Sequence, residues 1–449
     1  MRRFIAKNIG FYLQDKIKGT QTIDTYKFLQ SSQYWDQKLI EEYQLKKLKK
    51  LVKYAGENVP YYFDLFKAHN VNFKEIKSLN DIQKIPVLTK DIMREQGDSL
   101  LSIEQSKFKI KRGKTGGTTG APVKVFKDEY NRSFTWGSYY RWFDWMDVNY
   151  YDKIVTFWGA RTVLSSSFKS KLITNLQQYL QNDISFSSFE LTESKLEEIV
   201  NVILRNKPVL IKGYLSALID LANFLVKKKL KLDSLKAISS TTETLLPHNR
   251  KYLEQVFGVP VFDQYGCGEV SAISYECSEH NGLHINQEHV ICEILDSKGQ
   301  SLTNQSGRIV ATDLDNFVMP LIRFDTGDLG VISDKKCNCG VNQPLMTSIE
   351  GRAIDTIILK NGAKVHGVFF TDVLFELNIL SIKLQRFQIY QNIPGEIEFR
   401  IEKGSKLNEE EEKKLKKAML RFLNKVNLIR MEKLPVSKSG KFKYIVSEV

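Results

Sequence analysis

Glycines and threonines crowd one short segment of this chain, Lys114-Thr115-Gly116-Gly117-Thr118-Thr119-Gly120. Glycine lets backbone N–H groups close around an anion, threonine hydroxyls add hydrogen-bond donors, and lysine supplies positive charge. The segment is not a Walker A loop, because no Gly-Lys-Ser/Thr follows at the required spacing. It predicts a phosphate-binding loop, and a polar hairpin turn is the structural alternative.

A second segment combines an aromatic ring, glycines and a carboxylate, Phe262-Asp263-Gln264-Tyr265-Gly266-Cys267-Gly268-Glu269. The Tyr265 ring could stack on a nucleobase, and the Glu269 carboxylate could hold Mg²⁺ beside phosphates. A strand-to-helix turn that ends in a solvated glutamate explains the same residues equally well.

Two further segments are weaker when taken alone. Asp325 and Asp328 flank a Thr-Gly turn, an arrangement that suits capture of ribose hydroxyls. Two aspartates that cap a loop through Asx turns are an equally good interpretation. Lys441 follows Ser439-Gly440 and, by itself, is typical of a solvated turn.

Cysteine and histidine spacing predicts a structural zinc site. Cys277 and His280 form a Cys-x-x-His pair, and Cys337 and Cys339 follow about 60 residues later. Three thiolates and one imidazole are an accepted zinc ligand set. His284 is a rival for the imidazole position, and the alternative to a metal site is a group of free surface cysteines with loop histidines.

The elements that must position these residues follow from hydrophobic patterning. Apolar residues recur at helical spacing over 30–70. From about residue 105, short β-branched and aromatic runs alternate with helical stretches such as 216–228, which predicts an α/β domain with a largely parallel sheet. Ligands bind beyond the carboxyl ends of the strands in such sheets. The predicted strands occupy 153–159, 208–214, 235–240, 259–266, 289–296 and 307–314.

The last hundred residues form a separate pattern. Alternating strands are expected at 386–391 and 396–402, an amphipathic helix at 408–426 and a short strand at 442–447. We therefore predict an α/β fold with a large N-terminal domain over 1–352, helical over about 1–100. A small, mobile α+β C-terminal domain is expected over 353–449.

The composition excludes several classes. The formal net charge is +14, but it is concentrated at the ends: residues 1–60 carry 12 basic and 6 acidic side chains, and residues 401–449 carry 13 and 7. The nearly neutral body argues against a nucleic-acid groove. No apolar run is long enough to span a membrane, the first residues lack a signal-peptide core, and the five cysteines include no Cys-x-x-Cys pair. A cytoplasmic location is expected.

In their order and approximate spacing, the four segments resemble the signatures of the adenylate-forming superfamily. The nearest branch by resemblance is the phenylacetate–CoA ligase family, with the CapK-like proteins of polysaccharide loci. Supporting stretches are VKYAGENVPYYFDLFKAH, ISSTTETLLP and HNGLHIN. Some relatives also show a pattern similar to the cysteine and histidine set.

The resemblance implies a role for each matched position. The 115–120 loop would cradle the ATP phosphates, with Thr118 taking part in catalysis. Lys441 would enter the site with the small domain. The other implied nucleotide-site residues are Thr242 and Glu243 along the adenine, Tyr265 and Gly266 at the purine, Glu269 on Mg²⁺, Asp328 on the ribose and Arg352 near the hinge. Relatives often carry an acidic residue two places after that arginine, where this chain has Ile354.

The implied reaction is ATP-dependent activation of a small-molecule carboxylic acid as an acyl-adenylate, with release of pyrophosphate and transfer to CoA. An alternative is an amide- or ester-forming ligase that couples an acid or amino acid to a sugar or carrier. A non-catalytic, degenerate binding protein is an alternative of another class. The sequence leaves the oligomeric state open, a homodimer included.

The expected acyl-pocket residues are Trp158, Gly159, Gly213, Tyr214 and Cys267, although Cys267 and the aromatic residues are also typical of core packing.

Overall fold

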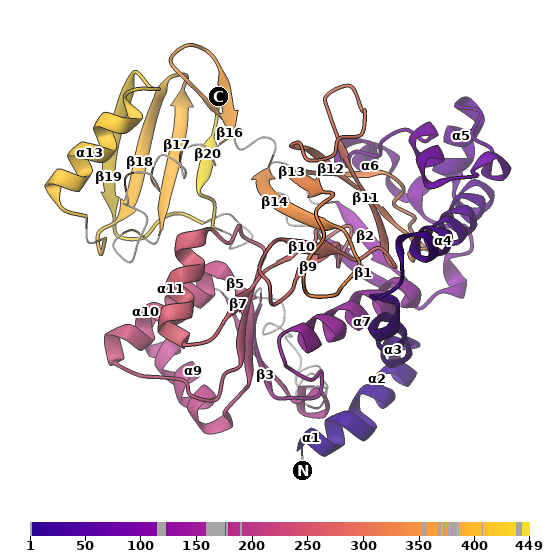
Figure 1. Cartoon of the computed structure of the whole chain (residues 1–449), viewed down its shortest axis with the longest axis horizontal. Helices are drawn as coiled ribbons and strands as arrows, with labels where there is room; N and C mark the ends of the chain where they lie inside the picture. The colour runs from indigo at the N-terminus through magenta and orange to yellow at the C-terminus, as the bar shows by residue number, and fades with distance from the viewer. Residues whose placement is uncertain are drawn as a thin grey trace.

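The chain folds into a helical N-terminal region, a parallel sheet, an antiparallel sheet and a C-terminal α+β unit (Figure 1). The structure is a computed structural model. It describes residues 2–114, 123–158, 176, 178–188, 191–352, 356–366, 370, 374, 377, 384, 386–405, 407–436 and 442–449. A large N-terminal part and a smaller C-terminal part confirm the predicted fold class.

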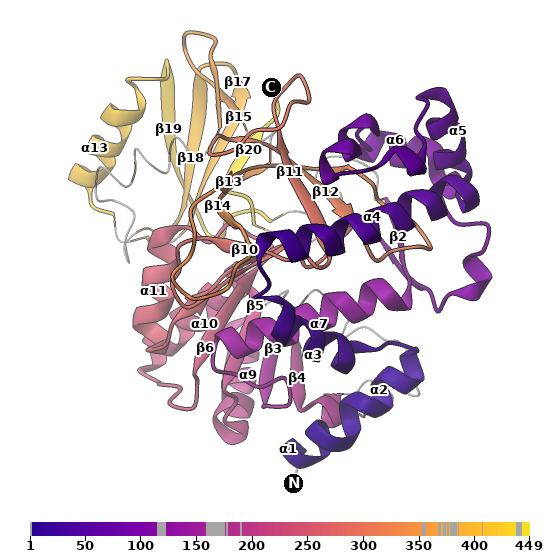
Figure 2. The same cartoon turned by 45° about the vertical axis from the view of Figure 1, so that its right-hand side comes forward.

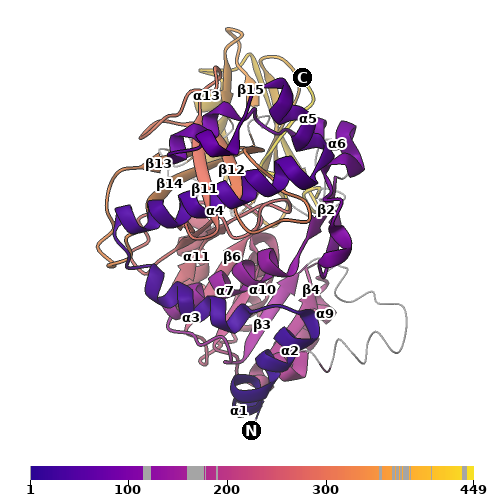
Figure 3. The ribbon, with the colours of Figure 1, turned by 90° about the vertical axis from the view of Figure 1, so that its right-hand side faces the viewer.

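Helix α4 (Gln37–Asn58) is the longest described helix of the N-terminal region, and it follows its sequence signals closely. The Asp36 side chain accepts a hydrogen bond from the Leu39 N–H and caps the helix start, and Pro60 begins the next helix. The apolar side of α4 packs against the antiparallel sheet, across which the helix runs in Figures 2 and 3. The other helices of this region are α1 (Arg2–Ile5), the π-helix η1 (Ala6–Gly10), α2 (Phe11–Lys18), α3 (Thr22–Ser32), α5 (Pro60–Ala68) and α6 (Lys90–Gln96).

The parallel sheet has five strands in the order β4-β3-β5-β6-β7. The strands predicted at 153–159, 208–214 and 235–240 are confirmed, the one predicted at 259–266 divides between β7 of this sheet and β8 of the antiparallel sheet, and β4 was not predicted. Helix α7 (Glu129–Trp145) covers one face, while α9 (Glu193–Asn206), α10 (Leu215–Lys228) and α11 (Pro247–Phe257) pack on the other side. Both faces are therefore buried, which explains the continuous apolar runs. The strands are β3 (Ile154–Trp158), β4 (Asp183–Ser187), β5 (Leu210–Tyr214), β6 (Ala237–Thr241) and β7 (Val261–Phe262).

The prediction of one largely parallel sheet is wrong for the segments at 289–296 and 307–314. They form two neighbouring strands of a seven-stranded antiparallel sheet, ordered β11-β12-β13-β14-β10-β9-β8. Only a short turned connection separates them, and antiparallel strands need no crossover helix. These strands are β8 (Gln264–Tyr265), β9 (Ser274–Glu276), β10 (Leu283–Ile285), β11 (Val290–Leu295), β12 (Gly307–Asp313), β13 (Phe324–Ser333) and β14 (Leu345–Arg352).

The C-terminal unit has its own core beneath a four-stranded sheet, ordered β19-β18-β17-β20. The helix predicted at 408–426 is shorter: α13 (Glu409–Met419) ends before a turn, and a strand that the sequence analysis missed follows, β19 (Lys425–Met431). Val426 packs into that core, so tertiary contacts override the helical pattern. The remaining strands are β15 (Thr356–Ile358), β16 (Lys364–His366), β17 (Phe387–Ile393), β18 (Glu396–Glu402) and β20 (Ile445–Ser447).

Among the described residues, no helix combines the length and apolar character that a membrane crossing requires.

Candidate active site

Tyr265 and Asp328 meet where the parallel and antiparallel sheets join. Tyr265 lies in β8 directly after the parallel sheet, and Asp328 lies in β13. The Tyr265 hydroxyl donates to the Asp328 carboxylate over 2.8 Å and lies 3.1 Å from the Thr326 hydroxyl. Burial and the Asp328 charge raise the pKa of Tyr265 well above its usual value, so the phenol stays protonated. The structure thus joins two of the sequence-predicted nucleotide residues directly.

Glu269 is the buried carboxylate of this site, with 2% of its surface exposed. Its Oε1 atom lies 3.4 Å from the Lys90 ammonium and accepts no hydrogen bond from a described residue. A buried carboxylate oxygen without a donor is costly in a folded protein. The donor set therefore fits a hard cation such as Mg²⁺, with Lys90 as the nearby positive charge.

Of the glycine- and threonine-rich segment, the structure describes only the two strands that flank it. Strands β1 (Lys111–Lys114) and β2 (Lys124–Lys127) form an antiparallel hairpin in which Lys114 pairs with Lys124. The sequence between them contains Thr115, Gly116, Gly117, Thr118, Thr119 and Gly120, all of which lie outside the described residues. Lys441 and the pocket residue Gly159 lie outside them as well.

The carboxyl end of β6 carries the predicted adenine segment. Thr242 has φ of 72°, an uncommon left-handed conformation for a residue with a branched side chain. The Glu243 carboxylate accepts hydrogen bonds from the Ser216 N–H over 2.8 Å and from the Ser216 hydroxyl over 2.9 Å. It also accepts from the Phe442 N–H over 3.2 Å, and Phe442 directly follows Lys441 in the sequence. This carboxylate therefore links both parts of the chain.

Other contacts also fasten the C-terminal unit to the parallel-sheet region. The Arg386 guanidinium forms an ion pair with Asp220 over 3.0 Å and donates to the Ser216 carbonyl. Asn249 donates to the Tyr444 hydroxyl over 2.6 Å. Arg352, at the end of β14, pairs with Asp328 in the strand register, so the predicted hinge position lies beside the predicted ribose residue.

Three of the residues predicted for the acyl pocket lie at the carboxyl ends of two strands: Trp158 in β3, and Gly213 and Tyr214 in β5. The Trp158 and Tyr214 rings pack edge to face, 5.4 Å apart, and Trp158 is 38% exposed. Gly213 must be glycine in this arrangement, because an added Cβ would lie 2.6 Å from the Phe157 Cβ. The Cys267 sulfur accepts from the Val270 N–H over 3.2 Å and packs against the apolar core. Burial raises the pKa of this thiol to about 12, which suits packing.

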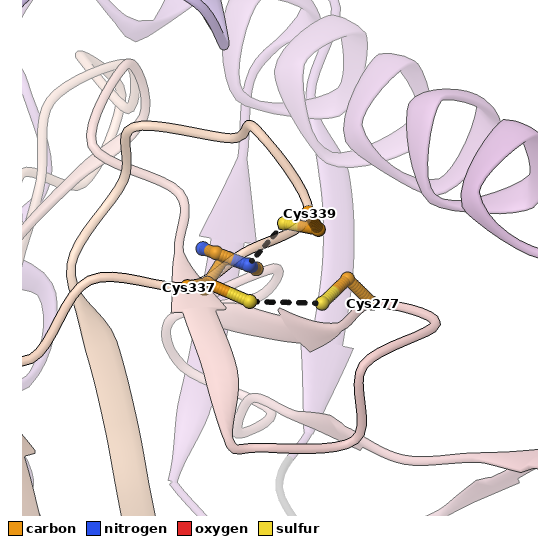
Figure 4. Close-up of side chains that lie close together, drawn as sticks. Cys277, Cys337 and Cys339 are labelled. Carbon is orange, nitrogen blue, oxygen red and sulfur yellow. Dashed lines mark hydrogen bonds between the residues drawn. The ribbon is translucent and has the colours of Figure 1, made fainter.

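The structure brings three thiols and one imidazole together, with ligand atoms all within 4.8 Å of one another (Figure 4). The sulfurs of Cys277 and Cys337 are 3.6 Å apart, and the Cys339 sulfur is 3.2 Å from His284 Nε2. The other imidazole nitrogen of His284 lies 2.9 Å from the Gln343 carbonyl, which can only accept, so Nδ1 donates and Nε2 keeps its lone pair.

The imidazole in this cluster is that of His284, so the prediction of His280 is wrong and its rival takes the position. The His280 Nδ1 atom lies 3.1 Å from the Arg250 guanidinium and 3.3 Å from the Glu276 carboxylate, which keep its ring beside Phe262. The chain turns back at His280, whose φ is 51°. The neighbouring β10 strand carries His284 toward the thiols instead.

Sequence reasoning missed Lys90, Thr326 and Arg386 as site residues. Lys90 lies far upstream of the antiparallel sheet in the sequence, and the sequence analysis treated Thr326 only as part of a turn. Their roles come from contacts between distant segments, for which no local pattern exists.

The chain is similar to known proteins in sequence and in fold. No protein-family model matches the chain. CapK of Staphylococcus aureus is 24% identical over 64% of this chain and 62% of CapK. A phenylacetate–coenzyme A ligase of Thermus thermophilus is 25% identical over 71% of each protein. The alignment thus spans less than two thirds of CapK.

Among solved structures, 2-hydroxyisobutyryl-CoA ligase in its postadenylation state matches with a TM-score of 0.75 at 18% identity, over 93% of each chain. The same ligase in its thioesterification state matches with a TM-score of 0.60. The fold is that of the adenylate-forming ligases. The curated relatives that this chain resembles in sequence, at 24–25% identity, are phenylacetate–coenzyme A ligases and CapK.

Proposed function

We propose that this protein activates a carboxylic acid with ATP, forms an acyl-adenylate and pyrophosphate, and then transfers the acyl group to the thiol of CoA. The observation that carries the proposal is the joined pair of Tyr265 and Asp328, with the buried Glu269 carboxylate nearby: Lys90 lies 3.4 Å from Glu269 Oε1 and donates to the Thr326 carbonyl over 3.2 Å. The relatives named phenylacetate–coenzyme A ligases support the acceptor.

Each residue of the proposed site has a role that follows from its chemistry. A carboxylate is a poor electrophile, so its oxygen must attack the α-phosphorus of ATP while two anions approach each other. Asp328 holds the ribose and Tyr265 stacks on the purine, with its hydroxyl fixed by Asp328. The 115–120 loop binds the phosphates, Thr118 among its donors. Charge neutralisation and positioning then lower the barrier.

Glu269 is the proposed Mg²⁺ ligand. The metal supplies positive charge beside the phosphates when it is bound. Lys90 balances the Glu269 carboxylate before nucleotide arrives, because the two charges lie 3.4 Å apart. The remaining proposed nucleotide contacts are the backbone along Thr242 and Glu243, Gly266 beside the purine, and Arg352 near the hinge.

A second acceptor class follows from the similarity to CapK. An amine or hydroxyl on a sugar or carrier would take the acyl group in place of CoA, and the first half-reaction would be unchanged. Mass spectrometry of products formed from ATP, CoA, amines and candidate acids distinguishes the two acceptors.

We further propose that Cys277, His284, Cys337 and Cys339 bind a structural Zn²⁺. Zinc–sulfur bonds of about 2.3 Å in a tetrahedron place two sulfurs roughly 3.8 Å apart. The Cys277 and Cys337 sulfurs are separated by 3.6 Å, close to that value. The ligands come from β10 and from two loops, so the metal would tie these loops to the antiparallel sheet.

The segment 353–449 is the proposed mobile domain, and Glu243 holds it in the present arrangement. The three groups that donate to Glu243 are the Ser216 N–H, the Ser216 hydroxyl and the Phe442 N–H. In Glu243→Gln, the side-chain NH₂ would replace one of the two acceptor oxygens and would face at least one of these N–H groups in either orientation of the amide. We expect acyl-adenylate formation to slow about 10-fold, while thioester formation from supplied acyl-adenylate is retained. Single-turnover kinetics of both half-reactions test this, with the exposed Glu197→Gln as control. Equal slowing of both half-reactions would contradict the role.

The activity itself is tested by ATP–pyrophosphate exchange over a panel of carboxylic acids. Exchange that depends on one class of acid supports the proposal. Folded protein that binds ATP but exchanges pyrophosphate with no acid would support the non-catalytic binding role instead.

Asp328→Asn is expected to raise the KM for ATP about 10-fold, because the neutral amide loses charge-assisted bonds to ribose hydroxyls. The amide oxygen still accepts from Tyr265, so the fold should persist. Exchange kinetics at varied ATP concentration provide the measurement, and Asp334→Asn, an exposed aspartate shortly after the same strand, is the control. An unchanged KM would remove Asp328 from the nucleotide site.

A further inference from the structure

Lys212 is a half-buried lysine on the face of the parallel sheet that α7 covers. It lies in β5, and its ammonium is 5.5 Å from the ring centres of Trp136 and Phe143 and 5.8 Å from that of Tyr139. Burial lowers its pKa. Among the described residues, no carboxylate forms an ion pair with Lys212 and no acceptor forms a hydrogen bond with it.

The carboxylate of Asp183, whose charge influences Lys212, already accepts hydrogen bonds from other side chains. The negative charge of Asp183 raises the pKa of Lys212 and so opposes the effect of burial. Its two oxygens, however, accept hydrogen bonds from the Thr156 hydroxyl over 2.9 Å and from the Ser185 hydroxyl over 3.2 Å. A lysine that serves only to stabilise a protein interior is normally paired, because an unpaired buried charge is costly. The three aromatic rings compensate the Lys212 charge only in part.

The strand register shows that Lys212 belongs to a polar strip. Lys212 pairs with Thr156 of β3 and with Ser239 of β6, so the three side chains share one face. The residues two positions earlier in these strands are apolar and pack in the same core as α7, namely Ile154, Leu210 and Ala237. The face beneath α7 is therefore apolar toward the amino ends of the strands and polar toward the carboxyl ends, where ligands bind in such sheets.

This strip leads to the nucleotide residues. The Tyr139 hydroxyl donates to Gln264 over 3.1 Å, and the Gln264 amide donates to the Thr241 hydroxyl. Gln264 precedes Tyr265, and Thr241 precedes the predicted adenine segment. The Tyr139 ring thus separates Lys212 from Gln264 and the neighbouring Tyr265, and Lys212 lies in the same strand as Tyr214.

We propose that Lys212 binds a second carboxylate on the acid substrate, so that the preferred substrates are dicarboxylic acids. The proposal rests on the proposed acid-activating function and specifies its substrate class. The reacting carboxylate lies at the nucleotide, and the distal carboxylate pairs with Lys212 between α7 and the sheet. Ser239 lies in the same strip and supplies a hydroxyl group beside Lys212.

The test compares acids matched in chain length: succinate with butyrate, glutarate with pentanoate and adipate with hexanoate. In ATP–pyrophosphate exchange, we expect kcat/KM to be about 100-fold higher for the dicarboxylic member of at least one pair. Lys212→Met, which keeps the aliphatic stem, should lose that preference while its activity with monocarboxylic acids stays within about 3-fold. Lys212→Arg should retain a preference.

The control variant is Lys236→Met, which removes an exposed lysine just before β6. Thermal unfolding checks that the Lys212 variants fold. Equal losses with both acid classes, or a wild-type protein that prefers monocarboxylic acids, would overturn the role of Lys212 but leave the acid-activating function intact.

If no acid supports exchange, the proposed acid-activating function fails. Equilibrium dialysis of labelled dicarboxylic acid with a non-hydrolysable ATP analogue then decides the Lys212 inference: binding lost in Lys212→Met supports it, and binding unchanged refutes it.

Discussion

Lys441→Ala is expected to reduce acyl-adenylate formation by roughly 10²–10³-fold, because a positive charge aimed at the reacting phosphate is lost. ATP binding should change little, since the loop at 115–120, Tyr265 and Asp328 are untouched. Thioester formation from supplied acyl-adenylate should be retained, because that step no longer builds charge on the α-phosphate. Rapid-quench measurement of AMP and pyrophosphate, with separate measurement of thioester, tests all three expectations.

The matched control is Lys438→Ala, which removes an equal charge three residues earlier in the same segment. That variant should keep most of the exchange activity. If Lys441→Ala retained full activity, or if both variants lost activity equally, the segment would act through its net charge and not through one catalytic lysine. The Phe442 N–H donates to the Glu243 carboxylate, so the residue that follows Lys441 in the sequence lies beside the carboxyl end of β6.

The second large effect is expected from loss of the thiol and imidazole cluster. Cys337→Ser should remove the bound zinc and lower the Tm by roughly 5–10 °C, because metal binding contributes to folding free energy and the loops at 277 and 337 would lose their common anchor. Metal analysis by mass spectrometry and differential scanning calorimetry provide the measurements. Treatment of the wild-type protein with a chelator should reproduce the shift.

Cys292→Ser is the appropriate control for this prediction. Cys292 is a partly buried cysteine in β11 and lies outside the cluster. Its substitution should leave the zinc content unchanged. His284→Ala should behave like Cys337→Ser, whereas His280→Ala should keep the metal because His280 bonds Arg250 and Glu276. Protein without zinc and with an unchanged Tm in Cys337→Ser would refute the metal site.

Local patterning predicted the core strands of the parallel sheet well. The runs that became β3, β5 and β6 are buried on both faces, so their continuous apolar character is visible without knowledge of their neighbours. The C-terminal strand β18 alternates in burial and was predicted equally well, and β17, which is mostly buried, was also predicted. Prediction failed where the partner decided the outcome. The strands at 290–295 and 307–313 pair antiparallel, and Lys425–Met431 became a strand because β18 lies beside it.

The sequence by itself determined the chemical inventory of this protein: the Gly- and Thr-rich segment, the residues Tyr265, Glu269 and Asp328, and the three thiols. Only the tertiary structure decided which of these meet. In the folded chain, the Tyr265 hydroxyl donates to Asp328 and Lys90 lies beside Glu269. His284, not His280, lies with the three thiols, and Lys212 lies beneath α7. The physical reason is that residue type and spacing are local properties. Contacts between segments hundreds of residues apart depend on how sheets and helices pack.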